Sequence, residues 1–167
     1  MTALTNNRST PKDESSAVKA VETVIAEHPF LKGIKPEHIR ILTSCAMRMT
    51  FRENELIFRE GDPANRFYLI EQGKVSLEAP RRDEPGEPIQ MVGPGEPLGW
   101  SWLYPPYYWH FDALAVEPTT AIFFYGTRLR EACEEDHDFG YELMKRMTQV
   151  VIHRLQATRK QLLAAPR

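Results

Sequence analysis

The sequence has 167 residues, 42% of them hydrophobic, which suits one domain with a buried core and excludes a chain that is disordered throughout. Its 21 basic and 23 acidic residues give a formal net charge of −2, without the basic excess that is typical of nucleic-acid-binding surfaces. No apolar run is long enough to cross a bilayer, and the polar start of the chain lacks the apolar centre of a signal peptide, so a cytoplasmic location is expected.

The N-terminal part of the chain predicts a tail followed by two helices. Residues 1–15 are polar and show no periodic apolar face, so they are expected to form a disordered tail. Ser15 and Ser16 can cap a helix, and apolar residues then recur at helical spacing over residues 17–25. A second, short helix is expected from about Pro36, whose fixed φ suits a first turn.

From about Ala46 the apolar pattern changes from helical to alternating. Met47, Met49 and Phe51 alternate with polar residues, which predicts a strand with one buried face. Short strand candidates follow, separated by Gly- and Pro-rich turns, at residues 56–58, 66–71, 74–79, 89–92, 111–117 and 120–125. This pattern favours a sandwich, roll or barrel over a parallel α/β sheet. The charged stretch 81–87 is expected to be a solvated hairpin connection between strands.

Residues 138–163 contain no Pro and only one Gly, which predicts one long helix. One set of positions along it alternates in spacings of four and three, and we call this set the seam: Met144, Thr148, Val151, Leu155, Thr158 and Leu162. Two helices bury their apolar edges against each other through such a pattern, so a homodimer through the seam is predicted. A helix that packs on its own β-domain would show a similar stripe, and that alternative stays open.

Three segments of the sequence are similar to one known family. They are residues 28–34 (HPFLKGI), 58–75 (FREGDPANRFYLIEQGKV) and 154–158 (RLQAT). Gly61 and Gly73 fall where that family places glycines between strands, in tight turns that need positive φ. Over residues 17–163 the chain resembles the cyclic-nucleotide-binding domain superfamily, in particular the sensor domain of the bacterial cyclic-AMP receptor protein family.

The resemblance implies a mainly β fold with flanking helices: a cyclic-nucleotide-binding-like β-roll (a double-stranded β-helix or jelly roll) plus a long C-terminal helix. Residues 16–137 would form the sensor domain with its N-terminal helices, and residues 138–167 the dimerisation helix. Proteins of that group usually carry a helix-turn-helix domain after this helix, whereas this sequence ends at Arg167. No direct DNA binding by this chain is therefore expected.

The resemblance also implies a ligand pocket, and this sequence departs from it. In the family, a glutamate holds the ribose 2′-hydroxyl and an arginine makes a forked contact to the cyclic phosphate. Here Trp100 occupies the glutamate position, Asp112 the arginine position and Ala113 the position of the small residue that follows. No Arg or Lys occurs from Ile89 to Thr127. Losing such a buried partner typically costs about 2–5 kcal/mol, so cyclic AMP and cyclic GMP are not expected to bind in the usual way.

Aromatic residues take the place of the missing polar groups. They lie in a stretch that we call the aromatic segment, residues 100–111: Trp100, Trp102, Tyr104, Tyr107, Tyr108, Trp109 and Phe111, with His110 among them. They could form a remodelled pocket for a flat apolar or cationic ligand, with Asp112 as its polar anchor. They could instead fill a closed pocket, with Asp112 bonded to backbone amides, or contact a partner protein. All three interpretations stay open.

The candidate ligand-binding residues are Gly99, Trp100, Ser101, Trp102, Trp109, Asp112, Ala113 and Thr158. Thr158 is included because the family places a threonine that contacts the base at the matching point of its long helix. A threonine at a heptad position equally fits a role in helix register, so it belongs to both the ligand-binding and the seam sets.

No cofactor or metal is expected. Cys45 and Cys133 are far apart and match no disulfide framework or zinc site. Haem ligation by His110, Cys133 or His137 is not favoured, nor is a metal site in the acidic run 134–138. No catalytic motif is present, which predicts a protein that is not an enzyme.

The sequence therefore predicts a cytoplasmic, homodimeric regulatory module with no membrane association. It would sense a ligand that is not a standard cyclic nucleotide. The alternative is a ligand-free module for dimerisation and protein interaction. A true cyclic-nucleotide-binding regulator is the third hypothesis. The small-molecule ligand or protein partner stays unidentified.

Overall fold

The computed structural model describes residues 11–166. Its helices are α1 (Pro11–Glu27), η1 (Pro29–Leu31), α2 (Pro36–Ser44), α3 (Gly126–Glu135) and α4 (His137–Ala164). Its strands are β1 (Ala46–Phe51), β2 (Leu56–Phe58), β3 (Arg66–Gln72), β4 (Val75–Arg81), β5 (Glu84–Val92), β6 (Pro97–Leu98), β7 (Asp112–Ala115) and β8 (Thr119–Tyr125). Within residues 11–166, no helix combines the length and the apolar character that crossing a membrane would require.

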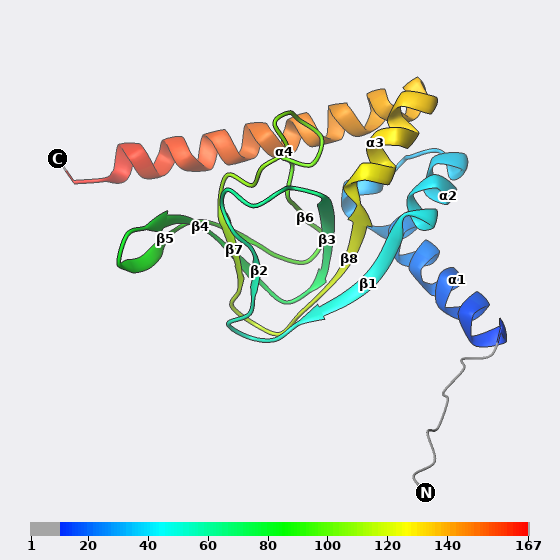
Figure 1. The fold of residues 1–167 in the computed structure, drawn as a ribbon, viewed down its shortest axis with the longest axis horizontal. Coiled ribbons are helices and arrows are strands. Elements are labelled where there is room, and N and C mark those ends of the chain that lie inside the picture. Colours follow the sequence, from blue (N-terminus) through cyan, green and yellow to red (C-terminus); the bar gives the residue numbers. More distant parts are fainter. Residues whose placement is uncertain (1–10, 167) are drawn as a thin grey trace, which may run out of the picture.

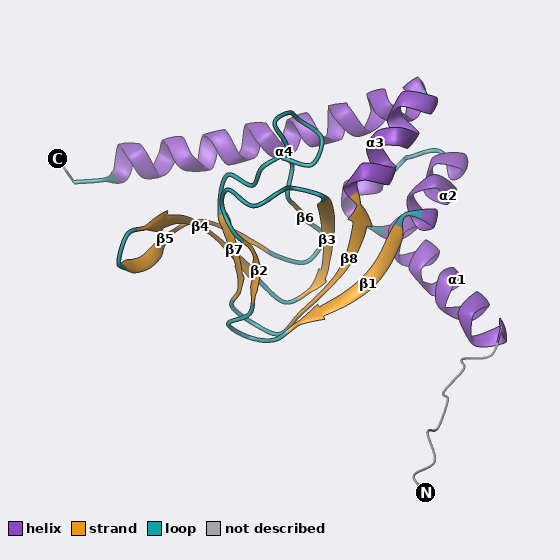
Figure 2. Ribbon diagram, viewed as in Figure 1, coloured by secondary structure: helices purple, strands orange, loops and turns teal. Residues whose placement is uncertain are grey.

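The strands form two antiparallel sheets that face each other as a β-roll, with the helices gathered outside it (Figures 1 and 2). One sheet has the order β1-β8-β3-β6 and the other the order β2-β7-β4-β5. The predicted fold class, a mainly β cyclic-nucleotide-binding-like roll with flanking helices and a long C-terminal helix, is confirmed. Gly61 and Gly73 adopt φ of 86° and 93°, as predicted for the turns between strands.

Strands β3 and β8 hold the two halves of the core together because both of their faces are buried. On β3, Tyr68 and Ile70 point into the roll, whereas Phe67 and Leu69 point toward the helices. This alternation follows from the two-residue period of a strand. The inner core therefore lies between the two sheets, and the outer core lies between the first sheet and helices α1–α4.

Three local expectations from the sequence need correction. The expected disordered tail falls partly outside the described residues, but α1 begins at Pro11, so residues 11–15 are helical. Proline fits the first turn of a helix, and that signal was missed. The stretch 81–87 is a hairpin connection, as expected, but β4 and β5 run further into it than predicted, to a turn at Arg82-Asp83 with φ of 62° at Asp83. Helix α3, from Gly126, was not predicted.

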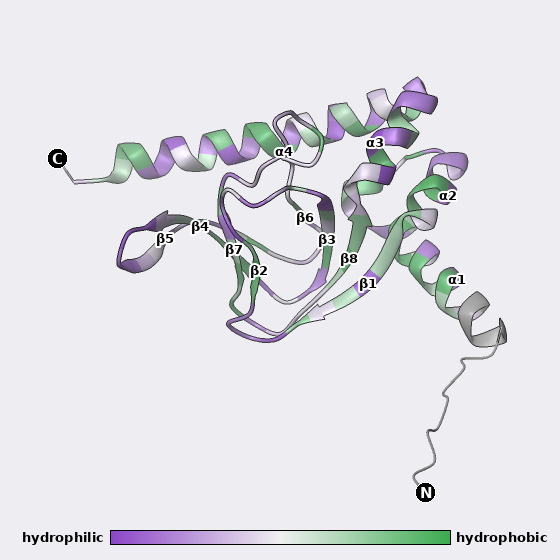
Figure 3. Cartoon of the chain, viewed as in Figure 1, coloured by the Kyte–Doolittle hydropathy of each residue, from purple (hydrophilic) through white to green (hydrophobic). Residues whose placement is uncertain are grey.

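Helix α4 has two different apolar faces, which gives it the banded colouring of Figure 3. Its inner face is buried against the protein's own core through Phe139, Leu143, Met147, Val150 and Arg154. The seam lies on another face, where Met144, Leu155 and Leu162 are 49%, 68% and 77% exposed. Packing on the chain's own β-domain and pairing with a second copy are therefore compatible, since one face of α4 packs on the domain and the other is exposed.

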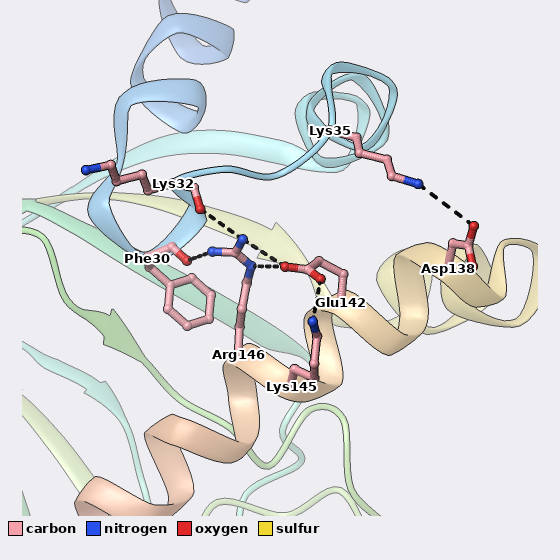
Figure 4. A network of polar contacts seen from close by, with 7 residues as sticks. All are labelled: Phe30, Lys32, Lys35, Asp138, Glu142, Lys145 and Arg146. Carbon is pink, nitrogen blue, oxygen red and sulfur yellow. Dashed lines mark hydrogen bonds and ion pairs between the residues drawn. The ribbon is translucent and has the colours of Figure 1, made fainter.

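A polar network fixes the first half of α4 to the chain that follows α1 (Figure 4). The Arg146 guanidinium donates to the carbonyl of Phe30 at 2.6 Å and to that of Lys32 at 2.9 Å. Its Nε also donates to the Glu142 carboxylate at 2.9 Å. The long helix is thus anchored by a charge-assisted contact as well as by apolar packing.

Candidate functional site

The predicted ligand-binding residues converge only in part. A cavity of about 10 Å³ lies where the roll meets α4. It is lined by Phe58, Leu77, Gly99, Trp100, Ser101, Trp109, His110, Phe111 and Arg154. Such a volume holds about one water molecule, so the pocket is closed in this state.

The Trp109 ring is buried between Phe58 of β2 and Gly99. Its ring stacks on Phe58 with centroids 3.8 Å apart and planes 10° from parallel. Gly99 makes this possible, because a Cβ atom there would lie 2.9 Å from the Trp109 ring. The backbone of Trp109 also exchanges hydrogen bonds with the turn before β3, at 2.9 Å from the N–H of Gly61 and 3.0 Å to the carbonyl of Asp62. Trp109 is therefore fixed by both packing and backbone pairing.

Trp100 and His110 close the remaining side of the cavity. Their rings stack with centroids 4.7 Å apart. The His110 Nδ1 atom lies 3.0 Å from the hydroxyl of Ser101, which is buried. Trp100 is only half-buried and His110 is exposed, so this pair borders solvent, unlike Trp109. The pair has the position of a cover over the cavity.

Trp102 does not line the cavity. It is fully buried in the outer core, where its ring packs on Phe67 with centroids 5.7 Å apart. Arg130 donates to its backbone carbonyl at 2.5 Å. Trp100 lies at the edge of the same outer core and lines the cavity, whereas Trp102 lies inside that core, so its closeness to Trp100 in the sequence does not bring it to the cavity.

Asp112, Ala113 and Thr158 also lie outside the cavity lining. The Asp112 carboxylate accepts a hydrogen bond from the N–H of Glu60 at 2.8 Å, so it binds a backbone amide, as the closed-pocket interpretation expects. Ala113 is buried in the inner core. Thr158 is exposed and donates to the carbonyl of Arg154, four residues before it, at 2.9 Å. The segment between Leu98 and Asp112 forms turns and no helix, consistent with the helix-breaking pair 105–106.

The sequence interpretation missed Arg154. No cation occurs in the segment from Ile89 to Thr127, yet the structure brings this arginine to the cavity from α4. Arg154 is 7% exposed, and its Nη2 donates to the carbonyl of Pro97 at 3.3 Å. Burial lowers its pKa to about 10, partly offset by the charge of Glu96. The available signal was its place on the inner stripe of α4, four residues after Val150.

The described residues hold no cluster of side chains of the kind that binds a metal ion. Among residues 11–166 no three His, Cys, Asp or Glu side chains are grouped so that they could hold a metal ion. Burial raises the pKa of Cys133 to about 11, so this side chain stays a thiol at neutral pH. A larger, open groove of about 670 Å³ lies between α3 and α4, away from Arg154, and its walls carry both acidic and apolar residues.

The comparison with known families gives the class of the protein. The sequence profile of the cyclic nucleotide-binding domain family matches residues 48–136, more than half of the chain, and the chain belongs to that family. It is a regulatory sensor domain of the cyclic-nucleotide-binding type.

Its relatives include transcriptional regulators. The chain is 22% identical over 142 residues to a CRP-like cAMP-activated global transcriptional regulator of Mycobacterium tuberculosis, covering 85% of this chain and 62% of that protein. The chain thus spans less than two thirds of the length of this relative.

Solved structures share the fold. A cyclic nucleotide-binding domain from Methylobacillus flagellatus matches with a TM-score of 0.76 and 18% identity, over 90% of this chain and 87% of that one. The regulatory subunit of a cAMP-independent protein kinase A from Trypanosoma brucei matches with a TM-score of 0.66 and 17% identity, over 82% of this chain and 49% of that one.

Proposed function

We propose that this domain is a non-enzymatic regulatory module that senses a ligand other than cyclic AMP or cyclic GMP and signals as a homodimer through α4. The observation that supports the proposal is that α4 carries both the arginine at the cavity and the exposed seam. The inner face of α4 brings Arg154 to the cavity, and the adjacent residue, Leu155, lies in the exposed seam. A ligand that moves Arg154 would therefore change the geometry of the seam directly.

The closed pocket supports the exclusion of cyclic nucleotides. Trp109 and Trp100 line the cavity, and its volume of about 10 Å³ is far below the roughly 300 Å³ or more of ordinary small-molecule sites. The position expected to bind the phosphate is an acid, Asp112, which is engaged with the backbone of Glu60. The Trypanosoma kinase subunit with the same fold is itself described as part of a cAMP-independent enzyme.

The seam supports the homodimer. Met144, Leu155 and Leu162 expose large apolar side chains in a heptad pattern, which is the arrangement of a helix that pairs with a copy of itself. Leu155→Asp should convert the dimer to a monomer without unfolding it, because Leu155 makes no core contact in the single chain. Gln156→Asp, one residue along and off the seam, is the matched control. Light scattering on the three proteins tests the proposal, and a wild-type monomer would contradict it.

A second candidate function is a ligand-free dimerisation and interaction module, and the filled cavity favours it. The two candidates differ in a simple measurement. A ligand that reaches the cavity must displace the Trp100–His110 cover, and it should therefore change tryptophan fluorescence and raise Tm. Silence across a broad metabolite panel, together with a co-purifying protein, would favour the second candidate.

A further inference from the structure

We propose that α4 pairs with α4 of a second copy in antiparallel orientation, and that the C-terminal end of each helix lies in the groove between α3 and α4 of the other copy. This inference rests on the proposed homodimer and adds its geometry. The open groove of about 670 Å³ then has an occupant, the stretch 155–163 of the second copy.

The seam of α4 continues into the groove. Tyr141 and His137 extend its alternating spacing of four and three from Met144 toward the start of the helix. All three residues line the groove. Tyr141 is 66% exposed, although it is a large side chain with an apolar ring. A helix that pairs along the whole seam must therefore also cover one wall of the groove.

The groove is held in shape by close packing on both sides. A Cβ atom on Gly140 would lie 2.9 Å from the carbonyl oxygen of Cys133, so the glycine lets α4 pack directly on α3. On the opposite wall, the Arg130 guanidinium lies 4.3 Å from the centroid of the Tyr107 ring and donates to the carbonyl of Trp102. The surface that would accept a helix is thus present in the single chain.

Charge is divided along this part of the chain. Residues 131–142 contain six Asp or Glu and no Lys or Arg, whereas residues 143–167 contain six Lys or Arg and no Asp or Glu. Glu131, Glu134 and Glu135 line the groove, and none of them forms an ion pair within residues 11–166. At the other end of α4, Arg159 and Lys160 are exposed.

These charges favour the antiparallel orientation. In a parallel pair, the acidic ends of the two helices would lie side by side, and so would the basic ends. In an antiparallel pair, each acidic end meets a basic end, and like charges across an interface are avoided. The two helix dipoles are then also opposed, which is the favourable arrangement.

One antiparallel register uses every position of the extended seam. It places Leu162 of one copy opposite His137 of the other, and Leu155 opposite Met144. Leu163 lies off the seam and is 74% exposed, so the groove walls would cover it. The last turns of α4 run past the body of the roll, whereas its first turns lie beside α3 (Figure 1). The same segment therefore supplies apolar side chains for the groove and the positive charge that its acidic wall lacks.

Disulfide cross-linking tests the orientation. The variants are His137→Cys, Leu162→Cys and the double variant, all with Cys133→Ser, because Cys133 lines the groove. Residues 137 and 162 are exposed, so the fold should be unaffected. They lie about 38 Å apart on one helix, which excludes a bond within one chain. Because a disulfide needs Cβ atoms about 4 Å apart, only the double variant should form a covalent dimer on mild oxidation.

Light scattering of each reduced variant separates the possible failures. A covalent dimer of either single variant would show parallel pairing, which overturns this inference and leaves the homodimer intact. A dimeric double variant that forms no cross-link would overturn the placement of the helix end in the groove. A monomeric wild-type chain would overturn the homodimer itself, and this inference with it.

Charge reversal tests the contact between the two ends. Arg159→Glu with Lys160→Glu should weaken dimerisation at least about tenfold at low ionic strength, because it sets acids against the acidic wall. Glu134→Lys with Glu135→Lys should do the same, and the four changes together should restore the dimer. Arg40→Glu, an exposed change on α2, is the control and should have no effect. Sedimentation measures the Kd of each, and reversals that have no effect or are not restored would contradict the inference.

Discussion

Arg154 of α4 donates a hydrogen bond to the carbonyl of Pro97 in β6, at 3.3 Å, and so ties the long helix to the strand that leads into the aromatic segment. The next residue, Leu155, is 68% exposed on the seam. The residue at the cavity and the residue on the seam are therefore neighbours on one helix, so a movement of Arg154 would also move Leu155. Ligand binding would shift the population between two dimer geometries. The size of that shift would depend on how much more tightly the ligand binds one geometry than the other.

The anchor at the other end of α4 predicts a stability effect. Arg146→Met removes a part-buried bond to the carbonyl of Phe30 and an exposed one to that of Lys32, and should lower the free energy of unfolding by about 1–3 kcal/mol. Lys145→Met is the matched control, since Lys145 makes exposed contacts to the Glu142 carboxylate and the Tyr141 ring. This change should alter the free energy of unfolding by less than about 1 kcal/mol. Urea unfolding followed by circular dichroism measures both. Equal losses in the two variants would show that the anchor contributes nothing of its own.

The packing of Trp109 predicts a larger loss. Trp109→Ala removes a buried ring that stacks on Phe58 and rests over Gly99, and should destabilise the domain by about 3–5 kcal/mol. Tyr108→Ala, next to it in the chain but 48% exposed, should change stability by about 0.5 kcal/mol or less. Chemical denaturation of the two variants checks this. A small loss for Trp109→Ala would mean that the ring does not fill the pocket in solution.

His28 predicts a pH dependence of stability. Burial lowers its pKa below the ordinary value of 6.5, and the hydrogen bond to Ile70 and the charge of Glu71 offset this only in part. Its Nδ1 accepts from the N–H of Phe30 at 3.3 Å, and its Nε2 lies 3.1 Å from the carbonyl of Ile70, so the neutral ring satisfies both contacts. The unfolded chain therefore binds more protons below pH 6.5.

The contribution of His28 is consequently complete above about pH 6.5 and is lost as the pH falls below it, with a slope of at most about 1.4 kcal/mol per pH unit. His28→Asn keeps an acceptor for Phe30 and has no proton to gain. Urea unfolding at several pH values between 7.5 and 5 should show a flatter pH profile for the variant. Parallel profiles would contradict the role of His28.

Much of the fold could be predicted from the sequence because the strands keep a clear two-residue period. Helix α3 was missed because it is largely polar, with Leu129 as its one fully buried large side chain, so its helical period is weak. The hairpin connection at residues 81–87 was predicted, but the length of its strands was not, because its turn, Arg82-Asp83, lacks glycine, and Asp83 adopts the positive φ instead. Local patterns could reveal neither α3 nor the extent of these two strands.

The site was predictable in part. Four of the proposed residues, Gly99, Trp100, Ser101 and Trp109, line the cavity, since they are close in sequence to the aligned glycine. Arg154 could not be placed there because an arginine on a helix is normally solvated, and its burial depends on packing against Pro97, which is distant in sequence. The prediction for Trp102 was wrong, because its ring lies inside the outer core, whereas its neighbour Trp100 at the edge of that core lines the cavity.

The measurement that tests the ligand proposal most directly is isothermal titration of the wild-type protein with cyclic AMP and cyclic GMP, repeated on Asp112→Arg. The closed cavity predicts no saturable heat with either nucleotide, even where the family's arginine is restored, because Trp100 and Trp109 still occupy the space. Saturable, one-to-one binding of either nucleotide to the wild-type chain would show that the pocket opens for the usual ligand and would contradict the proposal.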